Sequence, residues 1–233
     1  MMKAAASSVP SSRPFVVSDL TLYSYFRSSA AFRVRIALNL KNLTADMRYI
    51  HLLKDGGQHH AETYRGINPQ QLVPSLVHHG HSIGQSLAII EYLDEIAPDP
   101  PLLPAGSLAR ARVRQMADIV VCDIHPLNNL RVQKQLRRQF GASDEAIWEW
   151  QARWITVGFQ ALETLLTKDR SGDIFCHGDA PTLADICLIP QLANARRIEM
   201  DLSDFPTLLR IEEAAYRLPA FVTARPENQA DAT

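Results

Sequence analysis

The chain has 233 residues, of which 46% are hydrophobic and 21% are charged, and its formal net charge is −1. This length allows one large or two small domains, and the composition is typical of a globular protein. A net charge so close to zero argues against a protein whose overall field attracts nucleic acid or an anionic membrane, although local arginines can still bind a small anion.

The first residues are rich in Ala, Ser and Pro, and their apolar runs, such as residues 4–6, are too short for the core of a signal peptide. We therefore expect a flexible tail at residues 1–18. No later stretch approaches the roughly 18 apolar residues of a transmembrane helix. These features predict a cytoplasmic protein without a membrane span.

The first hundred residues predict a small mixed sheet with helices on it, because short β-type runs alternate with apolar residues at helical spacing. The predicted elements are a strand at residues 20–25, a helix from Ser29, a strand at 47–53, a hairpin at 75–78 and 81–83 that turns at Gly80, and a helix capped by Ser86 and ended by Pro98. This order is compatible with a thioredoxin-like α/β domain over residues 19–99.

A proline-rich stretch at residues 98–104 marks a boundary, since four prolines in seven residues cannot continue a helix. The remaining pattern predicts an all-helical domain over residues 105–225. Its first helix spans residues 108–140, with a bend at residues 128–129, and its third is opened by a capping box of Thr182 and Asp185. The apolar stripe of its second helix comprises Ile147, Trp150, Trp154, Val157, Ala161 and Leu165.

Cysteines and histidines give no sign of a disulfide framework or a metal centre. The cysteines, which we expect to be buried and reduced, are Cys122, Cys176 and Cys187. The histidines that lie close together are His78, His79 and His81. No carboxylate or cysteine completes a ligand set beside them, so we predict no metal site.

Ser28 and Ser29 lie where a predicted strand meets the start of a helix. The free amides and the dipole of a helix N-terminus favour an anion, and a thiolate held there by a serine hydroxyl has a lowered pKa. The simpler interpretation is that one serine is only an N-cap. These residues alone leave both interpretations open.

Two further positions have a structural and a functional interpretation. A cis peptide bond between Val73 and Pro74 would let the backbone of Val73 pair with an extended peptide ligand, whereas a trans bond is the commoner form. Gln85 and Ser86 mark a helix start that suits a ligand carboxylate or provides only an N-cap. The cations that suit a small carboxylate are Arg27, Arg131, Arg196 and Arg197.

Taken together, five segments resemble the zeta class of glutathione transferases over about residues 20–221 and across both predicted domains. They are residues 25–29 followed by 33–38, residues 68–69 leading to 73–74, residues 85–93, residues 125–130 and residues 193–197. Each motif alone is weak evidence for the family, whereas five motifs in the right order along the chain are specific for it.

The resemblance implies a thioredoxin-like glutathione domain, a helical domain that lines the substrate site, and a homodimer. It also implies an enzyme that uses glutathione to isomerise a cis double bond, from maleylacetoacetate to fumarylacetoacetate, as in the breakdown of aromatic amino acids, or from maleylpyruvate to fumarylpyruvate. The thiolate would add to the alkene, the resulting single bond would rotate, and elimination would release the trans product.

The same resemblance implies roles for individual residues. Ser28 would hydrogen-bond the glutathione sulfur, with Ser29 beside it. The residues placed on glutathione are His59, Val73, Pro74, Gln85, Ser86 and Asn129. The residues placed on the substrate are Arg27, His125 and Arg197.

One position departs from the family pattern. Ala30 stands where the pattern usually has a cysteine, whereas Phe32 keeps the aromatic residue two positions later. Isomerisation needs the sulfur of glutathione rather than a protein thiol, so the departure does not argue against a glutathione-dependent isomerase. It weakens the assignment of maleylacetoacetate over maleylpyruvate as the substrate. Two alternative functions remain, which are a general transferase that conjugates glutathione or dehalogenates α-halo acids, and a non-catalytic binding module with this fold.

Overall fold

The structure, a computed structural model, describes residues 18–168 and 173–232. Apart from Ser18, the tail predicted at residues 1–18 lies outside the described residues. None of the described helices is long and apolar enough to cross a membrane.

One four-stranded sheet forms the N-terminal part of the molecule, in the order β2-β1-β3-β4. β1 runs parallel to β2 and antiparallel to β3, and β3 pairs with β4 as an antiparallel hairpin. The strands are β1 (Thr21–Ser24), β2 (Asp46–Tyr49), β3 (Ser75–His78) and β4 (His81–Gly84). The predicted element order is therefore confirmed.

The second strand ends earlier than residue 53, where the sequence placed its end. The ring nitrogen of His51 accepts the backbone N–H groups of Leu53, at 3.1 Å, and Lys54, at 2.9 Å. These local bonds turn the chain out of the sheet and into two short 3-10 turns, Lys54–Gly56 and Gln58–His60.

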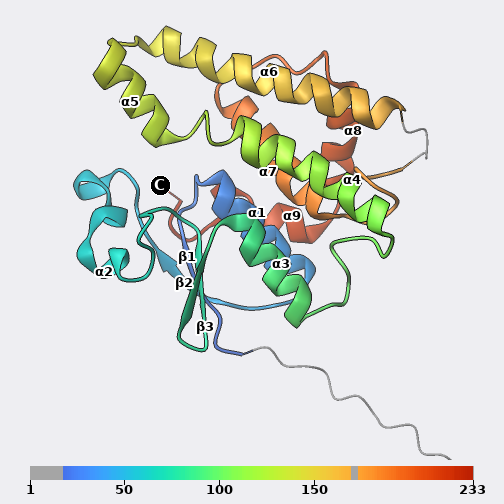
Figure 1. The fold of residues 1–233 in the computed structure, drawn as a ribbon, viewed down its shortest axis with the longest axis horizontal. Helices are drawn as coiled ribbons and strands as arrows, with labels where there is room; N and C mark the ends of the chain where they lie inside the picture. Colours follow the sequence, from blue (N-terminus) through green and yellow to red (C-terminus); the bar gives the residue numbers. More distant parts are fainter. Residues whose placement is uncertain (1–17, 169–172, 233) are drawn as a thin grey trace, which may run out of the picture.

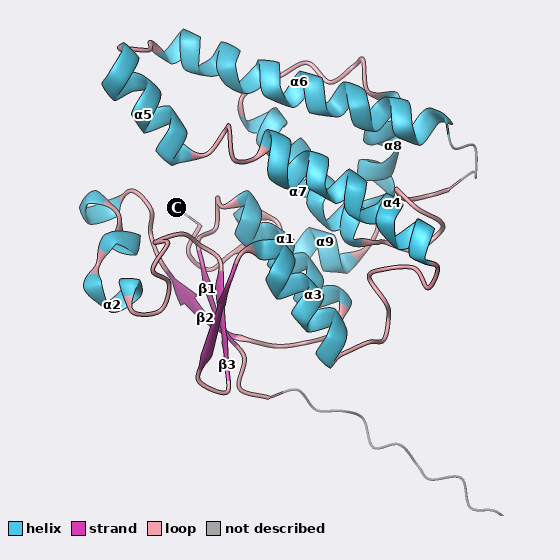
Figure 2. Ribbon diagram, in the orientation of Figure 1, coloured by secondary structure: helices cyan, strands magenta, loops and turns pink. Residues whose placement is uncertain are grey.

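The helices α1 (Ser29–Leu40) and α3 (Ser86–Ile96) lie together on one side of the sheet, and the short helix α2 (Glu62–Arg65) lies on the other (Figure 2). Leu22 and Leu76 of the strands are fully buried in one cluster with Phe32, Ile36 and Ile89 of the two helices. Burial of these side chains holds the start of α1 against the end of β1.

The described residues after α3 are mainly helical, and the helices α4 to α8 lie above α1 and α3 in the view of Figure 1. The elements are α4 (Ser107–Asp118), a π-helical segment (Ile119–Ile124), α5 (Leu130–Phe140), α6 (Asp144–Lys168), α7 (Leu183–Arg197), α8 (Pro206–Ala215) and α9 (Pro219–Thr223). Helix α7 packs against α1, so one apolar core continues through both parts. The division into domains at residues 19–99 and 105–225 stays a prediction.

The single helix predicted over residues 108–140 is wrong, because the chain leaves the helix between His125 and Asn129. Pro126 has no N–H to continue the helical hydrogen bonds. The side chain of Asn129 then accepts the backbone N–H of Arg131 at 3.1 Å and starts α5 as a new helix. The bend predicted at residues 128–129 is confirmed.

The buried face of α6 also differs from the predicted stripe. Val157 is 51% exposed, whereas Ile155 is fully buried. Gln151 takes a place on the buried face because its amide nitrogen donates to the carbonyl of Ile147, at 3.3 Å. Because glutamine is polar, the sequence pattern does not reveal its burial. Ile147 of the predicted stripe is buried as expected, whereas the rest of the stripe lies about one residue away from the buried face.

The cysteines divide into two groups. Cys176 and Cys187 are buried free thiols as predicted, and burial raises the pKa of both. Cys122 is exposed, which contradicts the expectation that all three are buried. It lies on the outward side of the π-helical segment, whose wider turn changes which residues face the core.

Candidate functional site

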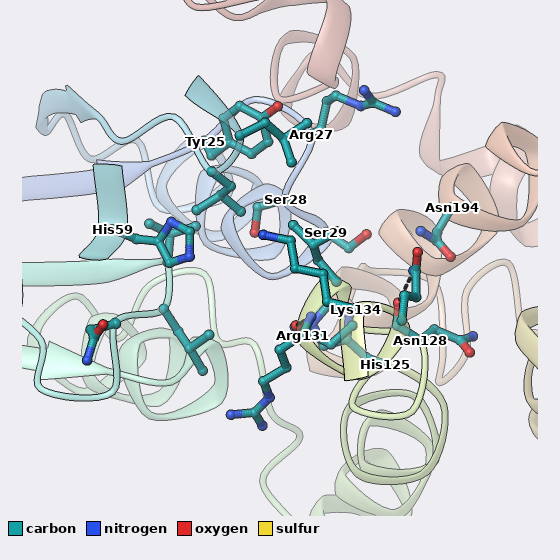
Figure 3. Close-up of a pocket in the computed structure, with 18 of the residues that line it drawn as sticks. Tyr25, Arg27, Ser28, Ser29, His59, His125, Asn128, Arg131, Lys134 and Asn194 are labelled. Atoms are coloured by element: carbon teal, nitrogen blue, oxygen red, sulfur yellow. Dashed lines mark hydrogen bonds between the residues drawn. The ribbon is translucent and has the colours of Figure 1, made fainter. Parts of the chain in front are cut away.

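A cavity of about 460 Å³ lies between the loops at the end of the sheet and the helices α5 and α7. It is lined by residues from the start of α1, the loops around residues 52–60 and 70–73, the segment 125–134 and the end of α7. Figure 3 shows side chains from these segments converging on it. Eight of the predicted site residues line it, and they are Arg27, Ser28, Ser29, His59, Val73, His125, Asn129 and Arg197.

Ser28 is the N-cap of α1 and also faces the cavity. Its hydroxyl oxygen accepts the backbone N–H of Ala31 at 3.2 Å, and its own N–H donates to the carbonyl of Tyr25 at 3.0 Å. Because the oxygen acts as the acceptor in the cap, its hydroxyl hydrogen is available for a ligand. Capping and binding are therefore compatible at this residue, beside the amides of a helix N-terminus.

The bond between Val73 and Pro74 is cis, which confirms the candidate position. The neighbouring carbonyl of Leu72 accepts the hydroxyl of Tyr64 at 2.6 Å and the amide of Asn68 at 2.8 Å. Within the described residues neither the N–H nor the C=O of Val73 has a hydrogen-bond partner. The segment is thus held from behind while the backbone of Val73 remains available to the cavity.

His59 is buried at the edge of the cavity, and its Nδ1 has no hydrogen-bond partner among the described residues. Burial, followed by the charges of His60 and Lys134, lowers the pKa of His59 to about 4. The ring is therefore neutral near pH 7, so it donates a hydrogen bond from one nitrogen and accepts one at the other.

His125 is likewise neutral. Burial, followed by the charges of Arg33 and Arg131, lowers its pKa to about 3. It lines the cavity just before the break that starts α5, so the predicted position inside a long helix is corrected, although the prediction that it reaches the cleft is not affected. Asn129 caps α5 and faces the same cavity.

Four cations line the cavity, and no Asp or Glu is among its described lining residues. The four are Arg27, Arg131, Lys134 and Arg197. Burial, followed by the charge of Arg27, lowers the pKa of Arg197. Two guanidinium groups that repel each other without a carboxylate beside them form a suitable site for an anionic ligand.

Arg196, the neighbour of Arg197, is used differently. Its guanidinium pairs with Glu212, with Nε 3.1 Å from Oε1, and it does not line the cavity. The sequence predicts both arginines as candidates for binding a carboxylate. They differ because consecutive residues of a helix point in different directions, so Arg196 meets Glu212 while Arg197 lines the cavity.

Three predicted glutathione residues do not line the cavity, and they are Pro74, Gln85 and Ser86. The amide nitrogen of Gln85 donates to Oε1 of Gln70, which does line it, at 2.8 Å. Ser86 does not cap α3 with its side chain, and its hydroxyl instead accepts a bond from Arg33. Contact of Gln85 and Ser86 with a ligand stays a prediction.

Lys134 is a lining residue that the sequence reasoning missed. It extends from α5 toward the loop that carries Ser28 (Figure 3), and its charge acts on His59. Spacing offered a signal, because Arg131 and Lys134 are three residues apart and so lie on one face of a helix. The predicted helix over residues 108–140 places these two residues on one face as well, so the spacing alone does not show that this face lines the cavity.

Comparisons with known proteins agree with this geometry. A family model described as the glutathione S-transferase N-terminal domain matches residues 22–101, and one described as the C-terminal domain matches residues 149–222. A probable maleylacetoacetate isomerase of Vibrio cholerae is 48% identical over 92% of this chain and 99% of its own length.

Solved structures give the same result. The holo structure of maleyl pyruvate isomerase, a bacterial zeta-class glutathione S-transferase, is 44% identical with a TM-score of 0.89, over 91% of this chain and all of that one. Maleylacetoacetate isomerase from Anaeromyxobacter dehalogenans, with GSH bound in its active site, is 42% identical with a TM-score of 0.81, over 92% and 99%. The chain therefore belongs to the glutathione S-transferase family, in the zeta-class group of the maleylacetoacetate and maleylpyruvate isomerases.

Proposed function

We propose that the protein is a glutathione-dependent isomerase that converts the cis double bond of a small dicarboxylic keto acid to trans, with maleylacetoacetate or maleylpyruvate as substrate. The observation that carries the proposal is a cavity lined by four cations and by a capping serine, without a carboxylate among the described lining residues. Such a cavity suits two anionic ligands, which are glutathione and a dicarboxylate.

The residues present fit glutathione as an extended, anionic peptide. The backbone of Val73 has no partner of its own in the described chain, so it can pair with the peptide. The hydroxyl of Ser28 is available to the sulfur, and His59 lies at the edge of the same cavity. Lys134 approaches from α5 (Figure 3), and Asn129, the N-cap of that helix, lines the same cavity.

Glutathione supplies a thiolate that adds to the alkene and leaves again, so that the bond can rotate in between. The hydroxyl of Ser28 and the amides at the start of α1 favour the charged form of a sulfur placed there. Arg27 and Arg197 hold the substrate carboxylates, and neutral His125 lines the same cleft without adding charge. A preorganised cationic cavity stabilises the negative charge that develops on the substrate.

The loss of the usual cysteine at Ala30 is compatible with this chemistry, because no protein thiol takes part in it. Ala30 is not among the described residues that line the cavity. We include in the proposal a homodimer that acts in the cytoplasm in the catabolism of aromatic compounds, as the family resemblance implies. Sedimentation of the purified protein tests the oligomeric state.

Absorbance of the enone, followed with purified protein and either keto acid, tests the proposal. With glutathione present we expect the trans product from at least one substrate, while titration of thiols shows that no glutathione is consumed. Stoichiometric loss of thiol would indicate a conjugating transferase instead. Normal glutathione binding without turnover of either acid would contradict the isomerase assignment, and no binding would leave only the non-catalytic module.

A further inference from the structure

The last described residues return from the helical part of the molecule to the sheet, where the C-terminal end lies beside β1 and the start of α1 (Figure 1). Residues 224–232 are here named the C-terminal strap. The amide of Asn228 donates to the carbonyl of Val222 at 2.7 Å, and the amide of Gln229 donates to those of Thr223 and Arg225, at 2.9 and 2.8 Å. These bonds give the strap a defined course.

Asp231 of the strap holds the backbone of the loop that leads to Ser28. Its Oδ2 accepts the backbone N–H of Phe26 at 2.9 Å, across 205 positions of sequence. The backbone carbonyl of Phe26 accepts a hydrogen bond from Nη2 of Arg35 at 3.1 Å. Both polar groups of the Phe26 backbone are therefore fixed by side chains of opposite charge, one from the strap and one from α1.

Arg35 joins the two segments further. Its guanidinium also donates to the hydroxyl of Ser24, at 3.2 Å, and to the carbonyl of Ala224 at the start of the strap, at 3.0 Å. Burial lowers the pKa of Arg35 to about 10, and the charge of Asp231 opposes that shift. The charge of Asp231 thus favours the charged form of an arginine that is almost fully buried.

Apolar contact adds to these bonds. Ala232 packs on a small cluster formed by Tyr25, Phe26, Tyr64 and Val73. Of these, Tyr25 and Val73 line the cavity, so the strap packs on a cluster that also forms part of the cavity wall.

We propose that Asp231 is a positioning residue that fixes residues 25–28 so that the Ser28 hydroxyl and the first amides of α1 meet the sulfur of glutathione. The inference rests on the proposed function in assigning the sulfur to Ser28. The bonds of Asp231 and Arg35 to the loop are formed by the chain itself, so this part can be tested separately in the ligand-free protein.

Asp231→Ala in the full chain tests the inference. In the ligand-free protein we expect hydrogen exchange at the Phe26 amide to accelerate by about tenfold or more, because a single acceptor protects it. With glutathione bound, thiolate absorbance in the ultraviolet should show a raised thiol pKa. Since misplacement by about 1 Å can cost 100-fold in rate, kcat should fall about 10- to 100-fold while KM for glutathione changes by less than about threefold.

Two further variants make the result specific. Asp231→Asn keeps an oxygen acceptor but loses the charge, so we expect intermediate values and a folded protein. Glu227→Gln, on an exposed residue of the same strap that pairs with Arg225, should match the wild type in every measurement.

Unchanged Phe26 exchange and an unchanged thiol pKa in Asp231→Ala would overturn the inference. So would a loss of kcat matched by equal acceleration of exchange throughout the protein, since that would indicate a general loss of stability. A wild-type protein that binds no glutathione would overturn the proposed function instead, and Phe26 exchange would still decide whether Asp231 fixes the loop.

Discussion

Nη1 of Arg33 lies 3.2 Å from the hydroxyl oxygen of Ser86, and both side chains are buried. The other two nitrogens of this guanidinium, Nε and Nη2, have no hydrogen-bond partner among the described residues. Among the described residues, Ser86 is therefore the one side chain that forms a hydrogen bond with this buried guanidinium. The bond joins α1 to α3.

Ser86→Ala should destabilise the protein by about 1–3 kcal/mol, because it leaves a buried charged donor without its acceptor. Urea denaturation measures this, with Ser82→Ala as the control, because the hydroxyl of this exposed strand residue also makes one hydrogen bond, to the carbonyl of Ile67 at 2.7 Å. A loss of glutathione affinity without loss of stability would instead favour the predicted contact between Ser86 and glutathione.

Gly57→Ala should be more harmful than Gly56→Ala, although both glycines have positive φ values, of +106° and +78°. A methyl group on Gly57 would lie 2.4 Å from Cε1 of His59, whereas one on Gly56 meets nothing within 4 Å. Backbone strain alone costs about 1–3 kcal/mol at either position. We expect Gly57→Ala to lower the free energy of unfolding by more than this in thermal denaturation, and to weaken glutathione binding, because the methyl group would clash with His59. Equal effects of the two changes would contradict the placement of His59 at the glutathione site.

The protein should lose stability in acid because of His125. Its pKa is about 3 in the folded state and near 6.5 in the unfolded chain, so the unfolded state binds the extra proton. Stability contributed by neutral His125 is therefore complete above about pH 6.5 and declines as the pH falls toward 3. His125→Asn should reduce the fall in the urea midpoint between pH 7 and pH 5 without abolishing it, because His59, whose pKa is lowered to about 4, loses stability over the same range. The same change at the exposed His81 should leave the fall in the midpoint unaltered.

Arg196 and Arg197 provide a matched pair of variants on one turn of α7. Arg197→Ala should lower kcat/KM for the dicarboxylate by about 10- to 100-fold, because it removes a charge-assisted contact worth about 1.5–3 kcal/mol. Arg196→Ala should leave kcat/KM near the wild-type value and lower stability, since it leaves the buried Glu212 unpaired. Steady-state kinetics and thermal denaturation distinguish the two effects. A loss of kcat/KM in Arg196→Ala together with a loss of stability in Arg197→Ala would contradict the roles assigned to these arginines.

Local signals in the sequence determined much of the fold. Ser28 before an apolar repeat predicts the start of α1, and Gly80 between two β-type runs predicts the turn of the hairpin. Thr182 and Asp185 marked the start of α7, where the carboxylate of Asp185 accepts the backbone N–H of Thr182 at 2.8 Å. Such features depend on residues within a few positions of one another, so a linear pattern contains them.

Contacts over long sequence distances were decided only by the tertiary structure. The buried side chain of Gln151 accepts a hydrogen bond at Oε1 from the amide of Gln133 on another helix, at 3.3 Å and across 18 positions, and Lys134 lines the cavity through the way α5 meets the sheet loops. The bond between Asp231 and Phe26 crosses nearly the whole chain. Polar side chains can be satisfied by water or by a distant partner, and the sequence does not say which, so their burial and their place at the site follow from how the folded elements meet.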